Sequence, residues 1–138
     1  IHFAYGCHTT VGDHFYSNFN LTVVDDGRVS IGNSVMFGPN VTISTTGHPV
    51  HPYYRMRGAH FSLPVVIEDG VWIGANVVVM PGVTIGKNSV IGAGSVVTRD
   101  IPENVVAFGT PCRVIRPITD ADLETIRPGM TINADWNA

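Results

Sequence analysis

Residues 67–101 are IEDGVWIGANVVVMPGVTIGKNSVIGAGSVVTRDI, in which an aliphatic residue returns at every sixth position. These aliphatic positions are Ile67, Ile73, Val79, Ile85, Ile91 and Val97. A small or β-branched residue follows each of them four positions later, at Val71, Val77, Val83, Ser89, Ser95 and Ile101. A period of six matches neither the roughly 3.6-residue period of a helix nor the two-residue alternation of an ordinary strand.

This period predicts an all-β protein, a left-handed parallel β-helix built as a hexapeptide-repeat solenoid. Each hexapeptide would form one face of a triangular prism, and its aliphatic side chain would point inward. The small residue would also point inward, near the corner, and Gly or Asn would form the turns between faces. The composition agrees, because 20 Val and 12 Ile stand against 3 Leu, and 15 Gly and 9 Pro supply turns. Val and Ile suit strands better than helices.

Weaker repeats precede this stretch, and the pattern changes on both sides of it. One set is Val11, Ser17 and Val23, and a second set, offset by two residues around 25–28, is Ile31, Phe37 and Ile43. Residues 44–66 lose the repeat, so we expect a projecting loop, the usual place for function on a regular scaffold. Residues 109–115 predict a closing strand and 119–126 a short C-terminal helix capped by Thr119. We therefore expect a β-helix domain at 1–118 and a C-terminal cap or tail at 119–138.

The charge balance and the cysteine content limit the possible partners and compartments. Lys and Arg number 8 against 11 Asp and Glu, a net charge of −3. This argues against nucleic-acid or anionic-membrane partners, which need clustered positive charge. Cys7 and Cys112 are too few for a disulfide framework, so we expect a cytoplasmic protein. No apolar run approaches the roughly 20 residues that span a bilayer, and no signal-peptide pattern is evident.

Five motifs narrow the function beyond the repeat itself. They are YSNFN (16–20), VVDD (23–26), TGHPVH (46–51), VWIGANVVVMPGVTIG (71–86) and GTPCRVI (109–115). In this order they resemble the galactoside and maltose O-acetyltransferases of the hexapeptide acyltransferase superfamily, over roughly residues 5–118. The resemblance implies a homotrimer that binds acetyl-CoA between neighbouring prisms and transfers its acetyl group to a sugar hydroxyl, with no metal required.

His48, in the TGHP motif, matches the catalytic base of that family. Removing a hydroxyl proton near neutral pH suits imidazole, whose unperturbed pKa is about 6.5. The resemblance assigns Asn18 and Asp26 to hydrogen bonds with the acceptor sugar, and Tyr16 to its border. Asn and Asp are also common turn residues, so a purely structural role for these two stays open.

The resemblance also supplies residues for the coenzyme. Ala75 matches a position whose backbone N–H lies close to the acetyl thioester, where it would stabilise an oxyanion. Trp72 lies just before Ala75 in the same motif, and it could be either a ligand contact or a packing residue. The remaining matches are Ala93, Thr98 and Arg99 along the pantetheine arm and nucleotide, and Arg113 and Arg116 facing the phosphates.

Other functions remain as alternatives. A sibling hexapeptide acetyltransferase could act on an antibiotic, an oligosaccharide or a serine-like acceptor. A non-catalytic scaffold would not bind acetyl-CoA. A zinc hydratase would need converging ligands such as His48, His51 and His60, whereas His2, His8 and His14 would lie on three successive faces of the prism. The roles of Cys7 and Cys112 stay open.

Overall fold

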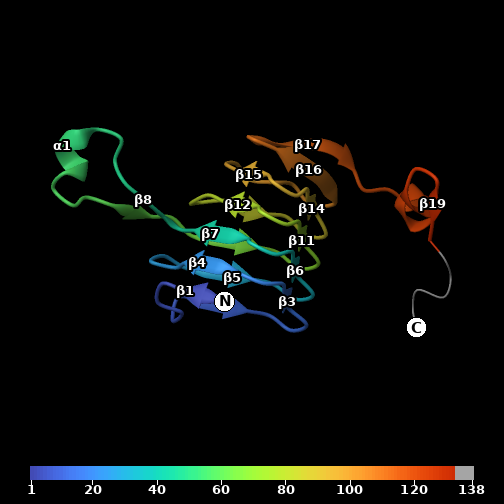
Figure 1. Ribbon diagram of the computed structural model, residues 1–138, viewed down its shortest axis with the longest axis horizontal. Helices are drawn as coiled ribbons and strands as arrows, with labels where there is room; N and C mark the ends of the chain where they lie inside the picture. The colour runs from blue at the N-terminus through green and yellow to red at the C-terminus, as the bar shows by residue number, and fades with distance from the viewer. Residues whose placement is uncertain (133–138) are drawn as a thin grey trace.

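The computed structural model describes residues 1–132 and confirms the left-handed parallel β-helix, with three sheets forming the faces of a triangular prism (Figure 1). Sheet A consists of β1 (His2–Phe3), β4 (Thr22–Val24), β7 (Thr42–Ser44), β12 (Val78–Val79) and β15 (Val96–Val97). Sheet B consists of β2 (Thr9–Val11), β5 (Val29–Ile31), β10 (Val65–Ile67) and β13 (Thr84–Ile85). Sheet C consists of β3 (Tyr16–Ser17), β6 (Met36–Phe37), β11 (Trp72–Ile73), β14 (Val90–Ile91), β16 (Val105–Gly109) and β17 (Cys112–Pro117).

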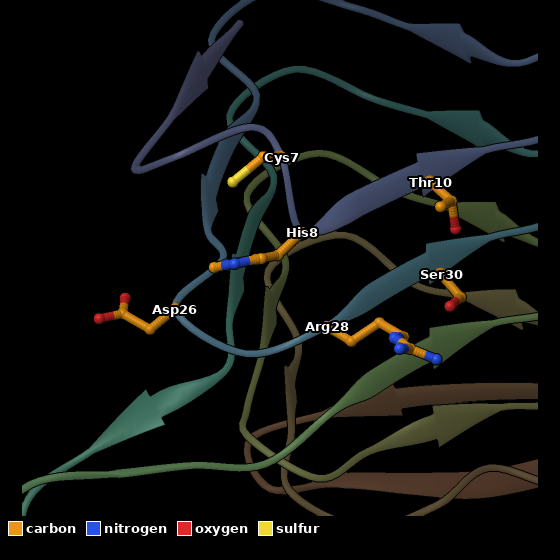
Figure 2. Close-up of a pocket in the computed structure, with 6 residues that line it drawn as sticks. All are labelled: Cys7, His8, Thr10, Asp26, Arg28 and Ser30. Carbon is orange, nitrogen blue, oxygen red and sulfur yellow. The ribbon is translucent and has the colours of Figure 1, made fainter.

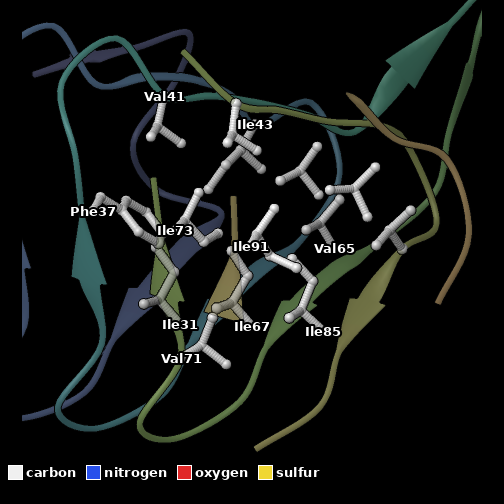
Figure 3. Close-up of a cluster of buried hydrophobic side chains, with 14 of the residues drawn as sticks. Ile31, Phe37, Val41, Ile43, Val65, Ile67, Val71, Ile73, Ile85 and Ile91 are labelled. Atoms are coloured by element: carbon white, nitrogen blue, oxygen red, sulfur yellow. The ribbon is translucent and has the colours of Figure 1, made fainter. Parts of the chain in front are cut away.

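The inward-facing aliphatic residues stack from coil to coil and form the core (Figure 3). Ile67 pairs with Ile85, which gives the coil of 18 residues that three hexapeptides require. The inward serines are buried but satisfied, because Ser89 Oγ donates to the Pro102 carbonyl and Ser95 Oγ to the Gly92 carbonyl, each at 2.6 Å. The predicted alternation of large aliphatic and small inward residues is therefore confirmed.

The first coils are longer than the repeat. Phe3 pairs with Val23 and Val11 with Ile31, so each of these coils uses 20 residues. The two extra residues lie at the corner between sheets A and B, once at 25–28, as the sequence indicates, and once at 5–8, which the sequence analysis missed. Asp25, which is fully buried, joins the two turns by accepting hydrogen bonds from the Tyr5 and Gly6 N–H groups.

Residues 46–62 leave the same corner as a projecting segment, which we call the arm (Figure 1). Its base is an antiparallel pair of short strands, β8 (Thr46–Gly47) and β9 (Phe61–Ser62), and its tip carries the helix α1 (Pro52–Arg55). Pro52 suits the first turn of α1, and His51 caps it by accepting the Tyr53 N–H at 3.1 Å. The projecting loop is confirmed, and its internal hairpin and helix are additions that a stretch without a period could not indicate.

The C-terminal part differs from expectation. Sheet C continues past residue 102, since β16 pairs in parallel with β14, and β17 returns antiparallel to it. The closing strand thus covers 112–117 instead of 109–115, because Gly109 ends β16 and residues 110–111 form the turn. The short helix is a single 3₁₀ turn, η1 (Asp120–Leu123), because a hairpin of β18 (Thr125–Arg127) and β19 (Met130–Thr131) follows directly. The last six residues of the expected cap, 133–138, lie outside the described residues.

Among residues 1–132, no helix has both the length and the apolar character needed to cross a membrane.

Candidate active site

The corner between sheets A and B carries the structural departures from the repeat, and four of the expected site residues lie at it. Asp26 lies in the insertion between β4 and β5, and His48 follows β8 at the base of the arm. The two segments are in contact, because the Gly27 N–H donates to Thr45 Oγ1 at 2.9 Å. Thr98 and Arg99 are exposed at the same corner higher in the prism, after β15.

His48 is exposed, and a hydrogen bond within the arm fixes its orientation. Its Nδ1 lies 3.0 Å from the carbonyl oxygen of Ala59. A carbonyl oxygen only accepts, so the proton of the neutral ring must be on Nδ1. The lone pair on Nε2 is then free to accept a proton from a substrate.

Asn18 and Tyr16 lie elsewhere, at the corner between sheets C and A, because they belong to β3 and the turn that follows it. Asn18 Oδ1 accepts the Phe19 N–H at 2.8 Å, which is the local turn contact favoured by its residue type. Tyr16 points outward from sheet C with 55% of its surface exposed. Sheet A separates this corner from His48, so one chain does not bring Asn18 and His48 together.

Ala75 and Ala93 occupy the same C–A corner in successive coils. Within residues 1–132, the Ala75 N–H has no hydrogen-bond acceptor. A Cβ built on Gly38 would lie 2.7 Å from the Ala75 nitrogen, and a Cβ on Gly74 would lie 2.7 Å from the Ala93 nitrogen. Only glycine therefore permits this stacking, and it leaves the Ala75 N–H uncovered by a side chain from the coil below.

The two arginines expected at the coenzyme phosphates lie on β17, at the end of sheet C. Arg113 is exposed and donates one hydrogen bond to the Cys112 carbonyl at 3.0 Å. Arg116 already holds a carboxylate, because it forms two hydrogen bonds to Asp122 at 2.8 and 2.9 Å. This contact, together with the hydrogen bond that Asp122 accepts from the Thr119 N–H, lowers the pKa of Asp122 to about 2. A phosphate at Arg116 must share or displace Asp122.

Trp72 points outward from the middle of sheet C and is 52% exposed. It lines an apolar cavity of about 410 Å³ between the sheet and the C-terminal hairpin. Arg116 also borders this cavity, together with Ile118, Ile126 and Ile132. Trp72 is thus accessible to a ligand and is not part of the core.

Comparisons with known proteins agree with this fold. Residues 64–99 match the family model for the bacterial transferase hexapeptide (six repeats). The galactoside O-acetyltransferase of Escherichia coli K12 is 60% identical over 122 residues, covering 88% of this chain and 60% of that protein. A solved galactoside acetyltransferase in complex with coenzyme A superposes with a TM-score of 0.89 at 51% identity, covering 96% of this chain and 66% of the other. A solved hexapeptide-repeat acetyltransferase from Vibrio cholerae superposes with a TM-score of 0.84 at 39% identity, covering 86% of this chain and 68% of the other.

The chain belongs to the hexapeptide acyltransferase superfamily. The resemblance inferred from the five sequence motifs is confirmed, and within the superfamily the chain is similar to galactoside O-acetyltransferases. It spans about 60% of the length of the curated relatives it matches first.

The chain also has a cavity beside Asp26 that the sequence analysis missed. The cavity measures about 480 Å³ and is lined by Cys7, His8, Thr10, Asp26, Arg28 and Ser30 (Figure 2). We call it the corner pocket. The signal that could have revealed it is the pair of two-residue interruptions in the repeat, at 5–8 and 25–28, because both insertions contribute to its walls.

The histidines proposed as alternative metal ligands do not form a cluster. His48 and His60 have ring centroids 6.3 Å apart, and His51 is turned toward the start of α1. In the part of the chain from 1 to 132, no three His, Cys, Asp or Glu side chains gather as a metal site would require.

Proposed function

We propose that this chain is the catalytic body of an acetyl-CoA-dependent O-acetyltransferase that acetylates a sugar hydroxyl, with residues 1–118 as the β-helix domain and 119–138 as its cap. A relative described as a galactoside O-acetyltransferase and a related structure solved with coenzyme A support the reaction class. The observation that carries the proposal is the hydrogen bond from His48 Nδ1 to the Ala59 carbonyl. It leaves Nε2 as a free base at the root of the arm.

In the proposed reaction, Nε2 of His48 accepts the proton of the acceptor hydroxyl while its oxygen attacks the thioester carbonyl of acetyl-CoA. The tetrahedral intermediate carries a negative oxygen, which the free Ala75 N–H stabilises. The C–S bond then breaks, and the His48 imidazolium returns its proton to the departing thiolate. The acetyl group passes directly from sulfur to oxygen, with no acyl-enzyme.

The proposed ligand contacts are divided between the same two corners. For the acceptor, Asp26 lies at the A–B corner, and Asn18 and Tyr16 at the C–A corner. For the coenzyme, Thr98 and Arg99 lie at the A–B corner, and Ala75 and Ala93 at the C–A corner. A second copy of the chain that places its C–A corner against the A–B corner of the first completes both sets. This division supports a homotrimer with its active sites between subunits.

The phosphates of the coenzyme would bind Arg113 and, in competition with Asp122, Arg116, while Trp72 borders the coenzyme. We further propose a cytoplasmic location, because Cys7 and Cys112 are both free thiols. The proposed reaction needs no metal, and we propose no nucleic-acid or membrane partner.

The direct test is acceptor-dependent release of free thiol from acetyl-CoA. The acceptors are a galactoside, maltose, glucose, serine and acetyl-accepting antibiotics. We expect release with a sugar, and release only with serine or an antibiotic would assign the chain to a sibling acetyltransferase. No release with any acceptor, together with no binding of acetyl-CoA in calorimetry, would indicate a scaffold and contradict the proposal.

A further inference from the structure

The corner pocket contains two opposite charges that do not pair with each other. Asp26 and Arg28 are two residues apart, yet within residues 1–132 neither side chain has a salt bridge or a hydrogen bond. Figure 2 shows them pointing to opposite sides, with the Arg28 guanidinium beside Ser30 and the Asp26 carboxylate on the far side of the turn. Neither charge is neutralised by the other, and both residues line the cavity.

The cationic side of the pocket also carries hydroxyl groups. Thr10 and Ser30 are direct partners in the β2–β5 ladder, and both line the cavity. Their neighbours along β5, Val29 and Ile31, are buried in the core, so Ser30 points outward by strand alternation. An arginine next to two hydroxyl donors is a typical binding arrangement for a carboxylate or a phosphate.

The pocket is held in shape from below by Asp25. Its carboxylate accepts hydrogen bonds from the N–H groups of Tyr5 and Gly6 and from Thr9 Oγ1, at 2.8 to 2.9 Å. His8 is fixed as well, because its Nδ1 lies 2.7 Å from the Asp25 carbonyl, which can only accept. Since the Asp25 carboxylate is buried and fully engaged with these donors, it is not available to pair with Arg28.

We propose that the corner pocket is a subsite for an anionic group on the acceptor, with Arg28 as the specificity-determining residue. This inference rests on the proposed function, in which Asp26 binds the sugar hydroxyls. An acceptor held by Asp26 then extends across the pocket and places a carboxylate or phosphate against Arg28, Thr10 and Ser30. The preferred substrates are acidic glycosides or sugar phosphates rather than neutral sugars.

The test compares two galactosides that differ only in the charge of the aglycone, 4-carboxyphenyl and 4-nitrophenyl β-galactoside, in the thiol-release assay at low salt. We expect the wild-type protein to use the carboxylate with a kcat/KM about tenfold higher, as suits one charge-assisted contact. In Arg28→Gln the ratio of the two kcat/KM values should fall to about one, and in Arg28→Glu below one. Raising the salt concentration should reduce the wild-type ratio. The same comparison of kcat/KM between galactose 1-phosphate and galactose tests whether the pocket binds a phosphate.

The control variant is Arg127→Gln, which removes another exposed arginine, on β18, and should keep the wild-type ratio. If the wild type shows no preference, or if Arg28→Gln retains it, the anionic subsite is wrong while acetyl transfer stands. If no glycoside is acetylated, the proposed function fails, and ligand-observed NMR then decides the subsite independently. Binding of the carboxyphenyl galactoside to the wild type and its loss in Arg28→Gln would support the subsite, and equal or absent binding would overturn it.

Discussion

The stacking of Gly38 beneath Ala75 gives a direct way to disturb the proposed oxyanion contact without touching a side chain of the site. In Gly38→Ala, the new Cβ would lie 2.7 Å from the Ala75 nitrogen and 3.0 Å from the Gly74 carbonyl carbon. Ordinary contact needs about 3.5 Å, so the two coils must separate locally by about 0.8 Å. Such overpacking costs about 1–3 kcal/mol of the free energy of unfolding. The Ala75 N–H moves by a similar distance, beyond the narrow range in which an oxyanion donor works.

We expect Gly38→Ala to lower kcat by about 10²-fold, close to the loss of one oxyanion donor. The KM for acetyl-CoA should change much less, because the Ala75 N–H acts mainly in the transition state. The control is Gly32→Ala, which creates a clash at another corner: its Cβ would press on the Asp69 carboxylate oxygen that accepts the Asn33 N–H, and it would lie 2.8 Å from the Asp69 nitrogen. The measurements are thiol release from acetyl-CoA and thermal unfolding followed by circular dichroism. If both variants lose similar stability and Gly38→Ala keeps its kcat, or if Gly32→Ala loses kcat equally, the oxyanion role of Ala75 is refuted.

Two further predictions concern buried and exposed carboxylates. Burial alone would raise the pKa of Asp25, but the hydrogen bonds from Tyr5, Gly6 and Thr9 outweigh it and leave the pKa lowered. The ionised Asp25 carboxylate therefore stabilises the fold above about pH 4, and this stabilisation is lost as the pH falls further. Asp25→Asn should lower the free energy of unfolding, measured in urea melts, by about 1–3 kcal/mol at pH 7 and by less in acid. A difference between wild type and variant that does not shrink in acid would contradict this. For Asp122, hydrogen bonds from Arg116 and from the Thr119 N–H hold the pKa at about 2, so a carboxyl NMR titration should give that midpoint in the wild type. The midpoint should rise in Arg116→Gln, where the Thr119 N–H still lowers the pKa and the guanidinium no longer does. A wild-type midpoint near 4 would show that the ion pair does not form in solution.

The coils could be predicted from the sequence because their packing is local and periodic. Every sixth residue from Ile67 to Val97 is aliphatic, and each of these side chains is buried. At the first coil the same rule is weaker, because within residues 1–132 no other coil packs beneath it. Val11 occupies an inward position there and is still 46% exposed.

The arm and the C-terminal segment could not be predicted in detail because they depend on contacts without a period. Residues 44–66 indicate only an interruption, whereas the His48 orientation depends on a carbonyl 11 residues away, at Ala59. The resemblance places Arg116 at the phosphates, and it cannot reveal that Asp122 already binds that guanidinium. Likewise, the corner pocket arises from two insertions that stack only in three dimensions.

The role of His48 is tested most directly by measuring kcat for acetyl-CoA-dependent acetylation of the best sugar acceptor in the wild type and in His48→Ala. We expect kcat to fall by at least about 10²-fold, the usual loss when a general base is removed. Because His48 is exposed and outside the core, the stability and oligomeric state should be unchanged. His60→Ala is the matched control, since its ring is the neighbour of His48 in the arm. A His48→Ala variant that keeps its turnover with an intact assembly would contradict general-base catalysis at this site.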